Sequence, residues 1–123
     1  MGDRPNQPPA GALAAEISNE IVRILRAHTG RGPTHAKTTI NGHLIVCMLE
    51  DTLTVGERTL VDAGHAQTVL DTRKLYQQAM RDELTEAVER LSGRKVLAFL
   101  SDNHINPDTG IEAFILRPQD SEE

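Results

Sequence analysis

The 123-residue sequence contains few aromatic residues and a single cysteine. It has no tryptophan, and its aromatic side chains are Tyr76, Phe99 and Phe114. It therefore lacks the stacking platforms with which proteins read single-stranded nucleic acid, and its core must be aliphatic. Cys47 alone cannot form an intrachain disulfide or a thiolate metal cluster, and its aliphatic neighbours predict an inert core thiol.

Basic charge is also scarce. Lys and Arg total 13 against 18 Asp and Glu, which gives a formal net charge of −5. A chain with this balance lacks the broad positive surface of nucleic-acid-binding proteins, so we expect no nucleic-acid partner. The weaker alternative is nucleic-acid binding through a local basic face formed by Arg73, Arg81 and Arg94.

Long hydrophobic runs are missing as well. No apolar stretch approaches the length of a membrane span, and residues 1–10 lack the apolar core of a signal peptide. Together with the single cysteine, these absences predict a soluble, cytoplasmic protein. Polar, proline-rich residues 1–10 and acidic residues 119–123 predict flexible tails on either side of one domain over residues 11–118.

The spacing of apolar residues predicts three helices. An amphipathic helix is expected over residues 12–28, where apolar side chains recur at helical spacing: Leu13, Ile17, Ile21 and Leu25. Thr54 and Glu57 form a capping box at the start of a short helix that Gly64 closes. A longer helix begins between His65 and Thr72 and stops at Ser92-Gly93.

Two β-hairpins are expected between and after these helices. Asn41-Gly42 is a strong two-residue turn signal and predicts a hairpin over residues 35–49, in which Ile40 faces His43 and Thr38 faces Ile45. A second hairpin joins residues 94–102 to residues 110–117. The order α, β, β, α, α, β, β predicts an α+β fold with one four-stranded antiparallel sheet.

The inner strands have apolar residues on both faces. Ile45, Cys47 and Leu49 point to one side of their strand, and apolar side chains also point to the other side: Leu44, Val46 and Met48. Residues 96–100 show the same pattern. Helices from a chain this short can cover one sheet face, so the second face needs either the remaining helix or another subunit. We predict the second of these, a homodimer.

The clearest candidate for a binding site is the turn Gly30-Arg31-Gly32-Pro33-Thr34. In the functional interpretation, exposed backbone N–H groups and the Arg31 guanidinium bind a phosphate or carboxylate. In the structural interpretation, the segment is a tight helix-to-strand connection whose arginine pairs with a neighbouring acid. The spacing matches neither of the established glycine-rich phosphate loops.

Other constellations carry less chemistry. The five histidines lack the spacing of metal ligands, and no nucleophile-elbow motif occurs. We therefore predict no catalytic residue, no metal site and no cofactor. The alternative is an enzyme that acts on a small phosphorylated or carboxylated molecule, which requires Arg31, Asp102 and His104 to converge in one pocket.

Several short motifs follow one another along the chain: Gly30 to Thr34, Asn41-Gly42, Leu53-Thr54 before Glu57, Gly93-Arg94-Lys95-Val96 and Ser101-Asp102. This combination, over residues 13–117, resembles the MpsC-like family of small bacterial proteins. The family takes its name from a component linked to a sodium-translocating, membrane-potential-generating system.

The resemblance implies a non-enzymatic accessory or regulatory protein associated with a membrane ion or bicarbonate transport system. It points to a set of motif residues that bind a partner or a small anion: Gly30, Arg31, Gly32, Thr34, Arg94 and Asp102. It assigns none of them a catalytic role.

Overall fold

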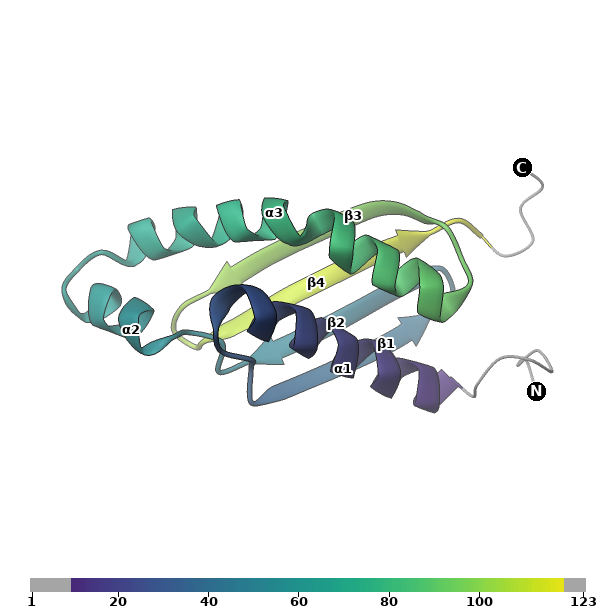
Figure 1. Cartoon of the computed structure of the whole chain (residues 1–123), viewed down its shortest axis with the longest axis horizontal. Coiled ribbons are helices and arrows are strands. Elements are labelled where there is room, and N and C mark those ends of the chain that lie inside the picture. The colour runs from purple at the N-terminus through teal and green to yellow at the C-terminus, as the bar shows by residue number, and fades with distance from the viewer. Residues whose placement is uncertain (1–9, 119–123) are drawn as a thin grey trace.

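The computed structural model describes residues 10–118 as a four-stranded sheet with helices on one face (Figure 1). The elements are α1 (Ala10–Thr29), β1 (His35–Asn41), β2 (Leu44–Glu50), α2 (Val55–Asp62), α3 (Ala66–Ser92), β3 (Val96–His104) and β4 (Thr109–Leu116). The expected α+β class and the order αββααββ are confirmed. The predicted tails lie outside the described residues, except for Ala10, which is the first residue of α1.

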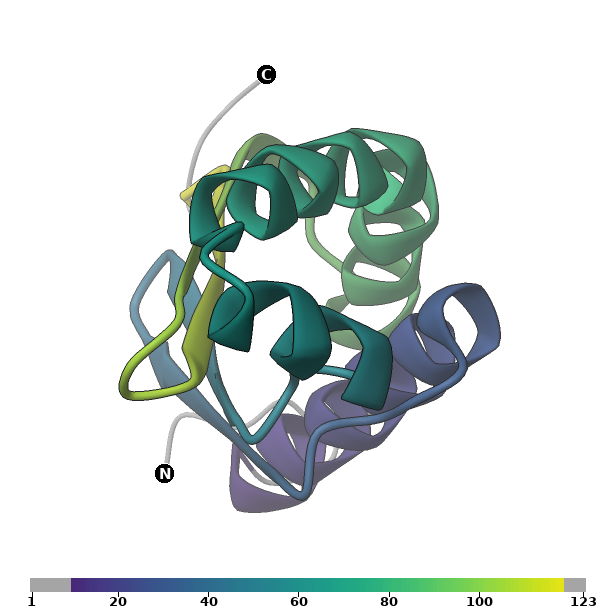
Figure 2. The ribbon, with the colours of Figure 1, turned by 90° about the vertical axis from the view of Figure 1, so that its left-hand side faces the viewer.

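The sheet has the strand order β1-β2-β4-β3, and every neighbouring pair is antiparallel. The two hairpins therefore join through β2 and β4, which occupy the centre and carry most of the aliphatic residues. The sheet is seen nearly end-on in Figure 2, with α1 and α3 on the same side of it. The side chains that alternate toward these helices form the core.

The β1–β2 hairpin differs from its predicted register. Its turn is Gly42-His43 rather than Asn41-Gly42, and Ile40 pairs with Ile45 rather than with His43. Gly42 has φ of +62°, the left-handed value that a type II′ turn needs at its first central residue. The partners shift by two residues, so every side chain stays on its predicted face, since strand side chains alternate with a period of two.

Local signals explain where the helices begin and end. Gly30, with φ of +80°, follows the last turn of α1, and its N–H donates to the carbonyl of Arg26 at 2.9 Å. The capping box of α2 is confirmed, because Thr54 Oγ1 accepts from the Glu57 N–H while Glu57 Oε1 accepts from the Thr54 N–H. Gly93 ends α3 in the left-handed conformation, as expected.

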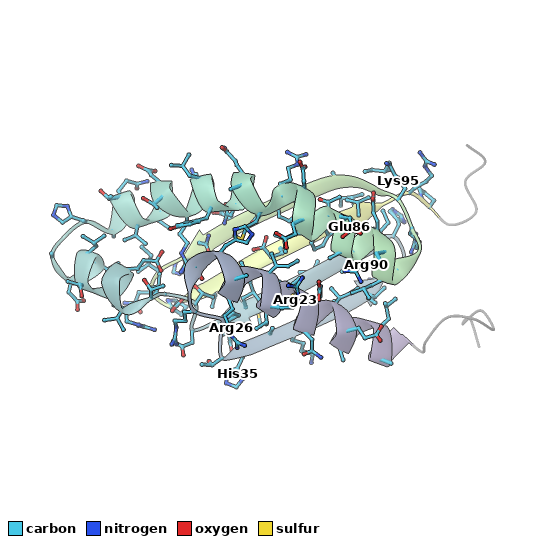
Figure 3. The ribbon with its side chains drawn as sticks, in the orientation of Figure 1. Arg23, Arg26, His35, Glu86, Arg90 and Lys95 are labelled. Carbon is cyan, nitrogen blue, oxygen red and sulfur yellow. The ribbon has the colours of Figure 1, made fainter. Side chains whose placement is uncertain are left out.

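The core lies between the sheet and the two long helices. It is almost wholly aliphatic, and its largest fully buried residues include Phe114, Ile17, Ile21, Ile24, Ile45, Leu84 and Leu116. Along the solvent side of the seam between α1 and α3, Arg23 and Arg90 lie among carboxylates (Figure 3). Glu20 pairs with Arg23 at 2.6 Å and with Arg90 at 3.3 Å. These ion pairs connect α1 to α3 on the solvent side of the aliphatic core.

Candidate functional site

A small polar cavity lies where the end of α1, the loop after it, the middle of α3 and the sheet meet. We call it the polar pocket; it is lined by Leu25, Thr29, Arg31, Pro33, Leu49, Thr52, Arg73, Tyr76, Gln77, Met80, Asn103 and Glu112. The volume open to the centre of a water-sized sphere is about 20 Å³. This is enough for a single water molecule or one oxygen atom of a ligand. The lining combines apolar residues with charged, amide and hydroxyl side chains.

Glu112 of β4 is the buried carboxyl group of this pocket. It shares the helix-facing side of β4 with Phe114 and is 4% exposed, and its Oε1 has no hydrogen-bond partner among residues 10–118. Burial raises the pKa of Glu112 to about 7, although the Ser101 hydroxyl and the charge of Arg73 act in the opposite direction. A buried, unsatisfied carboxyl that changes charge near neutral pH is a common mark of a functional site.

Arg73 of α3 is the buried cation of the pocket. It is 8% exposed, and its guanidinium donates from Nε to Glu57 Oε2 at 2.7 Å and from Nη2 to the carbonyl of Thr52 at 2.7 Å. Burial acts to raise the pKa of Glu57, but Arg73 and the capping N–H of Thr54 outweigh it and lower that pKa. The capping box of α2 is thus tied to the pocket wall through one carboxylate.

Arg31 stands at the solvent side of the pocket and pairs with Asp51. Its Nη2 donates to Asp51 Oδ2 at 2.7 Å, as the structural interpretation of the glycine-rich turn predicts. Desolvation acts to raise the pKa of Asp51, but the Thr34 hydroxyl, Arg31 and Arg58 outweigh it. The pKa of Asp51 therefore lies below its ordinary value. The Nε of Arg31, however, is buried without a partner in the described part of the chain, so one guanidinium N–H is left for another acceptor.

The two glycines of the turn have separate structural causes. Gly30 needs its positive φ, which strains any residue with a side chain. Gly32 avoids crowding, because a Cβ there would lie 3.0 Å from Val22 Cγ1 and 3.1 Å from Arg26 Nη2 and would push these side chains aside by a few tenths of an ångström. Together they bring Arg31 against the pocket while the chain turns from α1 into β1.

The structure separates two of the other expected site residues from this turn. Arg94 lies at the opposite end of the sheet, where its guanidinium donates to the carbonyls of Gly42 and Arg117, each at 2.9 Å. Asp102 lies on the edge strand β3, in register with Ile111 of the outer face, and also borders a different groove that Lys74 and Arg81 of α3 line. Of the predicted set, the structure brings Arg31 and Thr34 together around Asp51, and Arg94 and Asp102 lie elsewhere.

Comparison with known proteins identifies the family. A family model described as "Na+-translocating membrane potential-generating system (MpsC)" matches residues 10–118. The chain belongs to the MpsC family. No curated protein and no solved structure gives a significant match to it. Within residues 10–118 of this MpsC-family chain, no helix has both the length and the apolar character needed to cross a bilayer.

Of the two most unusual residues of this MpsC-family pocket, sequence reasoning missed Glu112 and expected Arg73 in a basic face at the surface, whereas the structure buries it. Glu112 alternates in phase with Phe114 and Leu116, so a charged residue stood at a core position of the second hairpin. Arg73 likewise falls on the stripe of α3 that buries Val69. The sequence did contain a signal for both residues. Each is a charged residue at a position where the spacing of apolar residues predicts a buried side chain.

Proposed function

We propose that this protein is a non-enzymatic accessory or regulatory component of a membrane ion or bicarbonate transport system, and that its polar pocket binds a small oxyanion. The family description supports the association with an ion-translocating system. The binding proposal depends on two residues that line the polar pocket, Arg31 and Glu112. Arg31 Nε and Glu112 Oε1 are both buried and have no hydrogen-bond partner among residues 10–118.

The chemistry of these two groups matches an oxyanion. The free Nε–H of Arg31 is a charge-assisted donor, and Glu112 in its neutral form is a second donor inside the cavity. The space admits one oxygen-sized group, so the ligand places one oxygen in the cavity and the others toward solvent. Tyr76 also lines the cavity, is 38% exposed and offers a hydroxyl.

The alternative functions find less geometric support. An enzyme built on Arg31, Asp102 and His104 needs the three side chains in one pocket, and neither Asp102 nor His104 lines the polar pocket as the structure describes it. A nucleic-acid face needs Arg73, Arg81 and Arg94 together at the surface. Arg73 is buried against Glu57, however, and Arg94 lies at the far end of the sheet.

The test is isothermal titration of the protein with bicarbonate and, separately, with inorganic phosphate. We expect binding by the natural protein and a loss of about tenfold or more in affinity in Arg31→Ala, since a charge-assisted hydrogen bond contributes about 1.5–3 kcal/mol. Arg90→Ala is the matched control, because Arg90 is an exposed, ion-paired arginine on the outer seam between α1 and α3. Circular dichroism of both variants confirms that they fold.

Two results would overturn the anion proposal. One is the absence of heat with either anion at millimolar concentration. The other is equal affinity in Arg31→Ala and the natural protein.

We also propose that the working unit is a cytoplasmic homodimer. The support is the second face of the sheet, which the helices of residues 10–118 leave uncovered (Figure 2). Large apolar side chains are exposed on this face, among them Met48, Leu100 and Ile111. A contiguous exposed apolar surface is typical of a site of protein association.

A further inference from the structure

The outer face of the sheet carries an apolar surface across three strands. Five of its large side chains are substantially exposed: Leu44, Met48, Leu97, Leu100 and Ile111. Met48 is 44% exposed and Leu100 is 57% exposed, although both lie on strands rather than in loops. In the described part of the chain both long helices lie on the other side of the sheet, so the helices of residues 10–118 leave this face uncovered (Figure 2).

The strand register arranges the outer face in rows that cross the sheet. One row runs Lys37, Met48, Ile111, Asp102 from edge strand β1 to edge strand β3. On one side of it the next rows run Thr39, Val46, Ala113, Leu100 and then Asn41, Leu44, Ile115, Ala98, and on its other side lies a polar row, His35, Glu50, Thr109, His104. The first row therefore has a cation at one edge, an anion at the other, and two apolar side chains between them.

We propose that a second copy of this chain covers the outer face, related to the first by a two-fold axis that lies between the sheets and runs along the strands. Such an axis reverses the order of the strands, so that β1 lies over β3 of the other copy and β2 lies over β4. Lys37 then meets Asp102 of the second copy, and Asp102 meets Lys37. This inference rests on the homodimer proposed above and is independent of anion binding.

Charge complementarity identifies a second copy as the occupant. A single row with Lys37 at one end and Asp102 at the other is self-complementary under this rotation, as an isologous interface requires. The central side chains also match, because Met48 lies over Ile111 and Val46 over Ala113. A bilayer surface offers no reason for opposite charges at the two edges of one row.

The size of the face is also adequate. Strands about 4.8 Å apart with a rise of about 3.3 Å per residue give four seven-residue strands a flat footprint of roughly 450 Å² on each subunit. Side-chain relief adds to this, so two copies together bury about 1,000 Å² or more, which a specific interface requires. Two sheets packed this way lie about 10 Å apart, with strands crossing at about 30°.

The experiment is sedimentation equilibrium of the full chain and of charge-reversed variants. We expect the natural protein to sediment at twice 13.5 kDa. Lys37→Asp and Asp102→Lys each place like charges opposite one another and are expected to weaken the dimer about tenfold, whereas the double variant restores it to within about threefold. Leu100→Glu places a charge at the apolar centre and is expected to weaken the dimer at least about a hundredfold.

Leu75→Glu is the matched control, because Leu75 is 65% exposed on α3, away from the sheet face. A natural protein that sediments as a monomer overturns the homodimer and this interface together. A dimer that withstands Leu100→Glu overturns this interface but leaves the homodimer standing. A dimer broken by Leu100→Glu whose charge reversals do not compensate one another overturns the two-fold arrangement.

Discussion

Replacing the buried carboxyl of the polar pocket tests the assignment of Glu112 as a titrating group. Its pKa is raised from the ordinary 4.5 to about 7 by burial. The folded protein therefore holds a proton that the unfolded chain gives up at lower pH. Stability from this group is complete below about pH 4.5, declines as the pH rises, and is lost above about pH 7.

The size of the effect follows from the same shift. The difference between the two pKa values corresponds to about 3 kcal/mol of unfolding free energy at alkaline pH. Gln has nearly the same shape as the neutral acid and does not ionise. We therefore expect Glu112→Gln to match the natural protein at about pH 4.5 and to exceed its free energy of unfolding by about 2–3 kcal/mol at about pH 8.5.

The assay is urea unfolding followed by circular dichroism, since the chain has no tryptophan for fluorescence. Protein concentration is held constant, and phosphate and bicarbonate are left out, because ligand binding and association both change apparent stability. Curves of unfolding free energy against pH that run parallel for the two proteins would refute the reasoning. They would show that Glu112 is charged in the fold at neutral pH or does not titrate with folding.

Two further variants test the buried ion pair beside the pocket and, at the other end of the sheet, the end of α3. Arg73→Met leaves Glu57 without its buried partner and is expected to lower the free energy of unfolding by about 2–3 kcal/mol, whereas exposed Arg81→Met changes it by less than about 0.5 kcal/mol. Equal effects of the two would contradict the ion pair. Gly93→Ala forces a side chain into φ of +71° and should cost about 1 kcal/mol in chemical unfolding; no loss would argue against the left-handed end of α3.

Local signals made much of the fold predictable. The capping box at Thr54 and the glycine stop at Gly93 depend on neighbouring residues, and both are confirmed. The register of the first hairpin was wrong because Asn41-Gly42 and Gly42-His43 both form two-residue turns that keep the same faces buried. Periodicity alone does not separate them.

The site was less predictable, because it depends on where distant segments meet. The glycine-rich turn pointed to Arg31, which does line the pocket, but the partners come from α3 and β4. Arg94 belongs to a different motif from any pocket residue. It lies just before β3, at the end of the sheet opposite the polar pocket, and the full length of the strands separates it from Arg31. Only the three-dimensional packing shows that Glu112 and Arg73 line the same cavity.

The most direct test of the pocket as an oxyanion site is titration calorimetry with sulfate, which stays fully ionised between about pH 6 and pH 8. If the bound anion requires neutral Glu112, affinity is expected to be about tenfold higher at pH 6 than at pH 8 in the natural protein and nearly independent of pH in Glu112→Gln. Affinity that is equal at the two pH values in the natural protein, or higher at pH 8, would contradict the account.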